Sequence, residues 1–533
     1  MTVIVNQVRF FLYALILLAC VLNAATFAAV KSDTKEMVNK DSQNEVSEPA
    51  LAQTYYVSEQ VSSSLPASFI SLLKKYKIPK ENISIYIRDL NASSPMLSLN
   101  ADRMRTPAST MKLLTTYAAL KELGPNYSWR TEVWLRGKLE NGKLDGDLLL
   151  KGYGDPFLVN EQYWKMIKTL RDKGLKQING GIIIDNSYFE LPPFDPATFD
   201  GKAFRVYNAQ ASALMFNFQA TRFLFTPVED ISEDKHETLK VKNKKKAKNK
   251  ELKGTVSVVP FPKIDNFTFD NQIRLVKGRC RKSHYRPELT KDKSGKLLIK
   301  GNYSAKCKQQ FILRAISTPE QHAYNAFRDF WKGLSGTLKG GGKVGTVRST
   351  DELFYVHSSP TLGEQIRLIN KWSNNVMTRQ LLLTLGARKY GAPGTLDKGR
   401  RAIIEVLENN GIDTIGIRLE NGSGLSRTAQ ISATQMGNLL ETAYRDPYMP
   451  EFMASLSLPG VDGTLVNRFN KDDLRGRSHF KTGTLDYVTA IAGYMLNRKG
   501  KRLVIVIQHN GKKTGGGRGR KIQDALLRWS FEQ

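Results

Sequence analysis

The feature that most constrains the fold is one sharply bounded helix, followed by a long strand-like region before helices return. Thr106-Pro107-Ala108-Ser109 opens this helix and Gly124-Pro125 ends it. Proline just inside the start and glycine just past the end are typical of helix boundaries. Residues 126–336 then alternate apolar runs with turns, which is typical of β-strands. Helical periodicity returns after residue 337, and the chain ends in strands and a last helix.

Strand-like runs on both sides of residues 126–336 predict one split domain. Residues 83–88 alternate apolar and polar side chains, and residues 490–495 and 503–508 are apolar runs near the end of the chain. We predict that these runs pair in one sheet flanked by helices. The domain then consists of residues 61–125 and 337–533. Residues 126–336 form an inserted, mostly-β region of two subdomains with a basic loop at 240–250.

The N-terminus predicts export. Arg9 precedes an uncharged apolar run, Phe10 to Val30, that becomes rich in alanine. A basic flank, an apolar stretch and small residues are typical of a secretory signal. We predict a signal peptide at residues 1–29, or a signal anchor, because about 20 apolar residues can also span a bilayer. A polar linker follows at residues 30–60. A periplasmic location is therefore expected, and nucleic acid is excluded as a partner.

Export also bears on the cysteines. Cleavage near residue 28 removes Cys20 and leaves Cys280 and Cys307, which are 27 positions apart, in an oxidising compartment. We predict that these two pair, which contributes about 3 kcal/mol by constraining the unfolded chain. Two free thiols are the alternative.

The net charge is unusually positive, with 80 Lys+Arg against 50 Asp+Glu and a net charge of +30. Anionic wall or membrane polymers are candidate partners for such a surface. A basic surface that is merely well solvated is the alternative. The segments 240–250, 277–308 and 512–521 carry much of the charge.

The first chemical motif is Ser109-x-x-Lys112 at the start of the bounded helix. Side chains three apart share a helix face, with about 5–6 Å between Cβ atoms, and the first helical turn has free backbone N–H groups. A neutral lysine can accept the serine proton, and burial or nearby cations lower its pKa towards that task. The spacing recurs at Ser32, Ser71 and Ser478, but only Ser109 follows two predicted strands and begins a capped helix.

Two further motifs complete the set. Ser373-Asn374-Asn375 (S-x-N) supplies a hydroxyl and an amide from a helix-rich segment. Lys481-Thr482-Gly483-Thr484 contains K-T-G on a predicted strand, where glycine leaves room for a ligand to lie alongside. A second K-T-G, residues 513–515, lies in a loop with no strand after it, so we favour Lys481.

The chain order S-x-x-K, S-x-N, K-T-G is that of the penicillin-recognising serine enzymes. The sequence resembles the class C low-molecular-mass penicillin-binding proteins, the D-alanyl-D-alanine carboxypeptidase/endopeptidase group of the penicillin-binding protein 4 type. The resemblance implies an α/β (α+β) fold, with an antiparallel sheet flanked by helices as in serine transpeptidases and β-lactamases and a large mostly-β insertion. Further matching stretches are Gly154-Asp155-Pro156, Ile184–Ser187, Asn421–Arg427 and Leu458–Thr464.

The resemblance implies how the peptide bond is cut. Ser109 would be the acylated nucleophile and Lys112 its general base, although the base assignment in related enzymes is disputed. Ser373 would pass a proton to the leaving amine, and Asn375 would hold the substrate amide. Water would then hydrolyse the acyl-enzyme.

The resemblance also implies how the substrate is held. Lys481, Thr482 and Thr484 would bind the terminal carboxylate, with Gly483 between them. The backbone N–H groups of Ser109 and Thr484 would form the oxyanion hole. Peptidoglycan stem peptides are the implied substrate and β-lactams the implied covalent inhibitors. No metal or cofactor is expected.

The match is looser around the third residue of the stem peptide. Tyr207 and Arg427 fit the aromatic and arginine positions of the family. Lys202 or a neighbour stands at the acidic position, with Asp200 two residues away, and Asp486 stands where glutamine is common. Two other functions remain as alternatives: a β-lactamase-like hydrolase with the same three motifs, and a non-catalytic basic wall-binding protein.

Overall fold

The computed structural model leaves the N-terminal segment and some loop residues undescribed. It describes residues 65–229, 252–263, 268–281, 283, 285–292, 294 and 296–533. The predicted signal segment (1–29), the polar linker (30–60) and the basic loop (240–250) lie outside these residues. Within them, no helix has the length and apolar character needed to cross a membrane.

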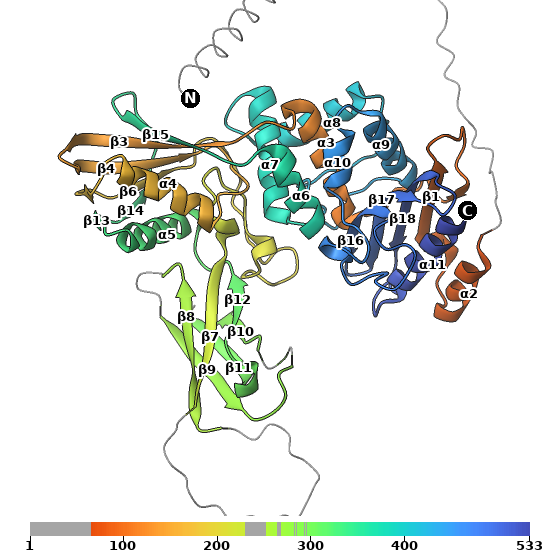
Figure 1. The fold of residues 1–533 in the computed structure, drawn as a ribbon, viewed down its shortest axis with the longest axis horizontal. Helices are drawn as coiled ribbons and strands as arrows, with labels where there is room; N and C mark the ends of the chain where they lie inside the picture. The colour runs from red at the N-terminus through yellow and green to blue at the C-terminus, as the bar shows by residue number, and fades with distance from the viewer. Residues whose placement is uncertain are drawn as a thin grey trace, which may run out of the picture. The chain divides into compact units, whose positions relative to one another are not determined.

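One antiparallel sheet joins the two ends of the described chain, as predicted. Its strand order is β16-β17-β18-β1-β2. Ile85 of β1 lies opposite Ile507 of β18, so strands from the two sides of the insertion are hydrogen-bonded neighbours. Figure 1 shows the orange β1 beside the blue β18. The strands are β1 (Ile83–Asp89), β2 (Leu97–Leu99), β16 (Ser478–Leu485), β17 (Val488–Leu496) and β18 (Arg502–Asn510).

Helices bury both faces of this sheet. Alternate residues of a strand point to opposite faces. Ile85 packs with α2 and α11 on one face, while Tyr86 packs on the other face with the larger helical layer. The two helices of the first face are α2 (Ala67–Tyr76) and α11 (Arg518–Glu532). The other layer contains α3 (Lys112–Leu123), α6 (Leu362–Trp372), α7 (Asn375–Tyr390), α8 (Leu396–Asn409), α9 (Ala433–Arg445) and α10 (Met449–Ala454).

The inserted region begins with a seven-stranded sheet packed against two helices, α4 (Asn160–Asp172) and α5 (Pro319–Gly333). β15 pairs with β3, so this sheet reaches Ser358, beyond the boundary expected at residue 336. From sequence alone, residues 337–358 could equally begin the next domain. Only their strand pairing assigns them to this sheet. They are β3 (Arg130–Glu140), β4 (Lys143–Gly152), β5 (Gln177–Ile178), β6 (Ile182–Asp185), β13 (Thr337–Leu338), β14 (Gly342–Val344) and β15 (Glu352–Ser358).

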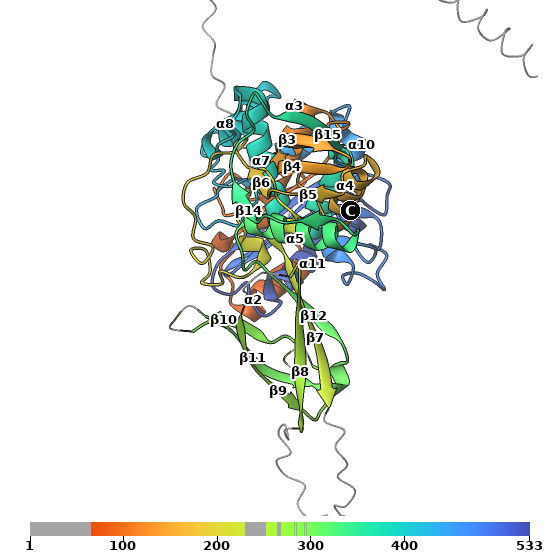
Figure 2. The same cartoon turned by 90° about the vertical axis from the view of Figure 1, so that its left-hand side faces the viewer.

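The rest of the insertion, here called the β module, consists of two three-stranded sheets around a separate core. β7, β8 and β12 lie side by side, as do β9, β10 and β11 (Figures 1 and 2). Cys280 and Cys307 form a disulfide with a Cα–Cα distance of 4.8 Å, as predicted. The strands are β7 (Thr221–Glu229), β8 (Gly254–Phe261), β9 (Phe269–Val276), β10 (Glu288–Lys291), β11 (Leu297–Ser304) and β12 (Gln310–Arg314).

Candidate active site

Ser109 lies in a single tight turn that leads directly into α3. The turn is a 3₁₀ helix, Ala108–Met111, and Lys112 is the first residue of α3. Ala108 has a φ of +49°, a conformation that costs energy for a residue with a Cβ and that clusters at functional sites. The Thr110 hydroxyl donates to the Pro107 carbonyl at 2.8 Å. The predicted helix is therefore present, and its first turn presents the half-buried Ser109.

The surroundings of the Lys112 amine are well defined. Lys112 Nζ donates to Asn375 Oδ1 at 2.6 Å and to the Ser423 carbonyl at 2.5 Å. Its distance to Ser109 Oγ is 3.1 Å. A neutral amine has two N–H donors and one lone pair. Because two carbonyl oxygens accept both donors, the lone pair is left for the Ser109 hydroxyl proton.

Burial favours this neutral form. Lys112 is fully buried, and loss of hydration holds its pKa well below the ordinary lysine value, with smaller contributions from the positive charges of Lys481 and Arg379. Sequence analysis missed Arg379. Its Nη1 donates to the Ala209 carbonyl at 2.7 Å. Burial lowers the pKa of Arg379 to about 10, which still leaves the guanidinium charged at neutral pH.

The S-x-N motif lies at the junction of α6 and α7. Ser373 ends α6 with a φ of +58°, and Asn374 caps α7 by accepting from Met377 N at 3.1 Å. Asn375 is the first residue of α7, which places its amide against Lys112. Because the chain turns sharply between α6 and α7, the Ser373 hydroxyl faces the Lys481 amine and the Asn375 amide faces the Lys112 amine.

Lys481 connects the K-T-G strand to the S-x-N motif. Its Nζ donates to Ser373 Oγ at 3.0 Å and to the Thr482 carbonyl at 2.9 Å. Burial lowers the pKa of Lys481 to about 7. Burial therefore lowers the pKa of two lysines beside the cleft, and each of them contacts a serine hydroxyl.

Gly483 allows β16 to approach the Ser109 turn closely. A Cβ at this position would lie 2.6 Å from the Pro107 carbonyl oxygen and 3.0 Å from Ser109 N. The first distance is shorter than a side chain tolerates, and the second is tight. The backbone N–H groups of Ser109 and of the strand residues near Thr484 thus border one space. This cleft of about 310 Å³ is lined by Ser109, Ser373, Thr464, Thr482, Gly483, Thr484 and Arg520, among others.

Two loops that match the family in sequence support the cleft. Gly424 packs so tightly that a Cβ would lie 1.8 Å from the Ala108 carbonyl oxygen, at a φ of +72°. The neighbouring Ser423 carbonyl thereby reaches Lys112. From a second loop, the Thr464 hydroxyl lies 2.8 Å from the Thr482 hydroxyl. Sequence analysis gave roles to neither Ser423 nor Thr464, although both stand in the matching stretches.

The competing motif copies lie elsewhere. Lys513 of the second K-T-G is exposed and donates to the Lys77 carbonyl at 2.7 Å. Ser71 is exposed on α2, and Ser478 is buried at the start of β16. None of these three residues lines the cleft. Ser32 lies outside the described residues.

The residues expected near the third residue of a stem peptide form two pairs. Tyr207 donates to Asp200 Oδ2 at 2.7 Å, and Arg427 pairs with Asp486 at 3.2 Å. The Arg427 guanidinium also lies over the Phe199 ring, 4.9 Å from its centroid. Asp200, rather than Lys202, is therefore the acidic residue against Tyr207. Lys202 contributes its backbone N–H to Asp200 Oδ1 at 3.1 Å.

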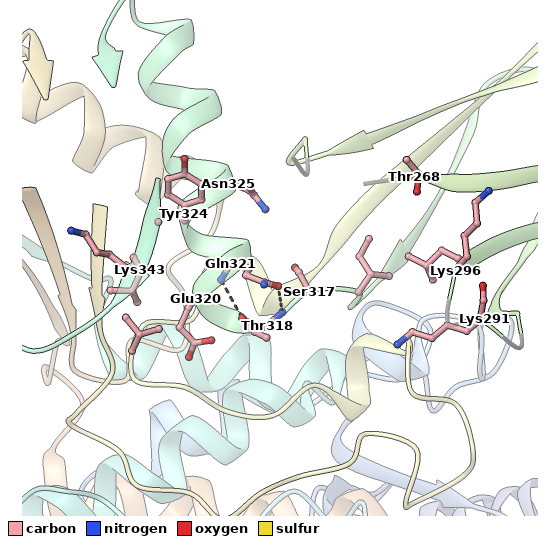
Figure 3. Close-up of a pocket in the computed structure, with 16 residues that line it drawn as sticks. Thr268, Lys291, Lys296, Ser317, Thr318, Glu320, Gln321, Tyr324, Asn325 and Lys343 are labelled. Carbon is pink, nitrogen blue, oxygen red and sulfur yellow. Dashed lines mark hydrogen bonds between the residues drawn. The ribbon is translucent and has the colours of Figure 1, made fainter. Parts of the chain in front are cut away.

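Larger hollows lie away from the motifs. A cavity of about 900 Å³ lies between α5 and strands of the β module. Figure 3 shows Tyr324 and Asn325 of α5 on one side and Lys291 and Lys296 on the other. None of the motif residues lines it. The motif residues Ser109, Ser373 and Thr482 instead converge on the smaller cleft.

The comparisons with known proteins agree with this geometry. The chain is 27% identical over 456 residues to a D-alanyl-D-alanine carboxypeptidase of Actinomadura sp. (strain R39), covering 83% of this chain and 80% of the relative. It is 25% identical over 448 residues to D-alanyl-D-alanine carboxypeptidase DacB of Haemophilus influenzae, covering 82% and 88%. The crystal structure of penicillin-binding protein 4 from the same organism matches with a TM-score of 0.69 at 21% identity, covering 87% of this chain and 99% of that one.

A family model carries the assignment. Residues 65–533, nearly all of the described chain, match the model of one peptidase family. The match spans all three motifs and the insertion between them. The protein is a serine peptidase and belongs to the D-Ala-D-Ala carboxypeptidase 3 (S13) family.

Proposed function

We propose that Ser109 is the nucleophile of this D-Ala-D-Ala peptidase and Lys112 its general base. The observation that carries the proposal is the amine of Lys112, whose two N–H donors go to carbonyl oxygens and whose third contact, at 3.1 Å, is Ser109 Oγ. Removal of a positioned base lowers rates by about 10²–10⁴-fold in other enzymes. A lysine held neutral by burial is ready for that role at neutral pH.

The acylation step follows from these contacts. Ser109 Oγ attacks the carbonyl carbon of the penultimate D-alanine while its proton moves to Lys112 Nζ. The carbonyl oxygen becomes an oxyanion between the backbone N–H groups of Ser109 and Thr484. The C–N bond then breaks, and the leaving amine takes the proton of the Ser373 hydroxyl, which Ser373 regains from the ammonium of Lys481 at 3.0 Å. Water hydrolyses the resulting ester by the reverse sequence.

The K-T-G strand supplies the substrate-binding edge. The Thr482 and Thr484 hydroxyls, with Lys481, bind the terminal carboxylate, and Gly483 keeps the strand close to Ser109. Asn375 accepts from Lys112 and offers its remaining amide donors to the substrate carbonyl. Arg520 on the wall of the cleft adds positive charge on the carboxylate side.

The substrate that fits is a peptidoglycan stem peptide, free or cross-linked, in the periplasm. The Tyr207–Asp200 and Arg427–Asp486 pairs offer both signs of charge, which suits a third residue with an amine and a carboxylate. β-Lactams would acylate Ser109; a relative of known structure was solved with one bound. The positive net charge would hold the enzyme near anionic wall or membrane polymers.

The deciding experiment uses fluorescent penicillin on the purified chain without its first 29 residues. A covalent adduct that maps to Ser109 by mass spectrometry, is lost in Ser109→Ala and hydrolyses slowly supports the proposal. Fast hydrolysis would indicate a β-lactamase-like enzyme instead. A folded protein without any adduct would contradict the proposal. Digestion of purified dimeric muropeptides then separates endopeptidase from carboxypeptidase activity.

A further inference from the structure

A second hollow, between the loop at residues 201–205 and the β module, has six cationic side chains among its lining residues. Its volume is about 1320 Å³. One carboxylate, Glu288, is among its lining residues. The cationic side chains that line it are Lys202, Arg205, Arg281, Arg286, Lys291 and Arg314. We call it the arginine pocket.

Arg314, at the end of β12, is its central residue. It is only 8% exposed, and its one recorded side-chain hydrogen bond is to the carbonyl of its neighbour Leu313 at 2.8 Å. No carboxylate pairs with Arg314 within the part of the chain that the structure describes. A buried charge is normally paired, because removing it from water is costly.

The cations of the arginine pocket repel one another. Burial, with smaller contributions from the charges of Arg205 and Arg286, lowers the pKa of Arg314 to about 10. The guanidinium nevertheless stays charged at neutral pH. Unlike a buried lysine, an arginine cannot relieve its burial by losing a proton. An anion with two oxygens is the partner that would satisfy it.

The arginine pocket continues from the substrate-binding edge. Arg427, which pairs with Asp486 just after β16, lies over Phe199. The next residue, Asp200, accepts from Tyr207. Arg205 and Arg314 lie close enough to Tyr207 for their positive charges to act on its pKa. The Ala315 N–H donates to the Phe204 carbonyl at 3.0 Å, which ties β12 to this loop.

We propose that the arginine pocket binds a carboxylate of the peptide substrate, on a residue adjacent to the one that contacts Tyr207 and Arg427. The inference rests on the proposed function for the identity of the substrate. It extends the binding site from the cleft into the β module. Arg205, Arg286 and Arg314 would then set specificity for an acidic stem peptide.

The test compares two soluble stem peptides that differ only in this carboxylate, which is converted to a carboxamide in one of them. Arg314→Gln and Arg205→Gln are expected to raise KM for the carboxylate peptide about tenfold, because each removes one of the guanidinium groups that would pair with the peptide carboxylate. The KM for the carboxamide peptide should change less than twofold. Arg205 is exposed, so its variant tests the pocket even where Arg314→Gln does not fold.

Arg222→Gln is the matched control, since Arg222 is an exposed arginine on β7 that does not line the pocket. It should resemble the wild type with both peptides. Equal losses on both peptides, or no loss on either, would overturn the proposal. The proposal would also be overturned if Arg314→Gln and Arg205→Gln weakened binding of a soluble polyphosphate but left the KM of the peptide unchanged. The pocket would then bind a separate anionic polymer.

A binding measurement separates this proposal from the proposed function. Fluorescence anisotropy of the two labelled peptides with Ser109→Ala needs no catalysis. Tighter binding of the carboxylate peptide that is lost on adding Arg205→Gln supports the pocket, even if penicillin fails to acylate Ser109. Equal affinity for the two peptides contradicts the pocket, even if acylation proceeds as proposed.

Discussion

Two groups of buried cations in this protein differ in what they face. In the cleft, Lys112 and Lys481 lie against neutral oxygens from Asn375, Ser423 and Ser373. In the arginine pocket, the buried Arg314 lies near other guanidinium groups. Burial lowers the pKa in both places, but the consequences are opposite.

The difference comes from the chemistry of the two side chains. A buried lysine can lose its proton and become a base, so neutral acceptors are sufficient partners for it. An arginine remains charged, so its burial calls for an anion. The cleft is thus complete without a ligand, whereas the arginine pocket is suited to receiving one.

The largest expected effect tests the cleft side of this comparison. Lys112→Ala should lower the rate of penicillin acylation by about 10²–10⁴-fold, because it removes the amine that contacts Ser109 Oγ and would accept its proton. Stopped-flow measurement of adduct formation gives the rate. Lys74→Ala is the matched control, since Lys74 belongs to the exposed S-x-x-K copy on α2 and should have no effect. A loss smaller than tenfold for Lys112→Ala would argue against the base assignment.

The second prediction asks whether the β module and the cleft are stabilised separately. Replacing both Cys280 and Cys307 by serine should lower the free energy of unfolding of the β module by about 3 kcal/mol, because the loop of 27 residues is no longer closed. Hydrogen exchange of peptides from β7–β12 measures this loss. Penicillin acylation should stay at the wild-type rate. A parallel loss of acylation would show that the two regions are coupled.

The third prediction concerns close packing at the cleft. Gly483→Ala should cost about 1–3 kcal/mol in stability or acylation, because its Cβ would overlap the Pro107 carbonyl. Thermal melting and acylation rate are the measurements. Gly515→Ala, in the second K-T-G, has no atom within 4 Å of its added Cβ and should be silent. If Gly483→Ala and Gly515→Ala had equal effects on stability and acylation rate, close packing would not distinguish the two K-T-G motifs.

The smallest expected effect concerns Arg379, which is a buried arginine like Arg314 but lies near the cleft lysine Lys112. Its positive charge lowers the pKa of Lys112. Arg379→Gln removes this repulsion, so the pKa of Lys112 rises and a higher pH is needed to form the neutral amine. The acid side of the acylation pH profile should therefore move to higher pH, with a few-fold lower rate on that side and little change at alkaline pH.

Arg379→Lys keeps the charge and should restore the wild-type profile. A uniform loss of rate at every pH in Arg379→Gln would instead indicate a structural role through its hydrogen bond to the Ala209 carbonyl.

Much of the cleft could be predicted because its signals are local. Pro107 and Gly124 bound a helix, and the helix repeat alone places Ser109 and Lys112 on one face. The pairing of the first strand with the last could also be inferred, because the alternation of residues 83–88 and the apolar run of residues 503–508 are both typical of sheet strands. The S-x-x-K and K-T-G motifs were distinguished from their copies by the elements around them.

The remaining parts of the site depend on contacts between distant segments. The Ser423 carbonyl reaches Lys112 from 311 positions away, and Arg379 and Thr464 reach the cleft only through the packing of their helix or loop. The sequence left the acidic position at Lys202 or a neighbour, with Asp200 two residues away, because loop residues have no periodicity that fixes which side chain faces Tyr207. The end of the inserted sheet at Ser358 was likewise set by strand pairing.

The sequence by itself determined the order of the three motifs, the pair of cysteines and the identity of the chemical groups, and it predicts an export signal. Those properties depend only on composition, spacing and local periodicity. Only the tertiary structure decided that Lys112 faces two carbonyl oxygens and that Arg314 is buried without a carboxylate. A pKa and an unpaired charge depend on what surrounds a group in space, and that environment is assembled from segments hundreds of residues apart.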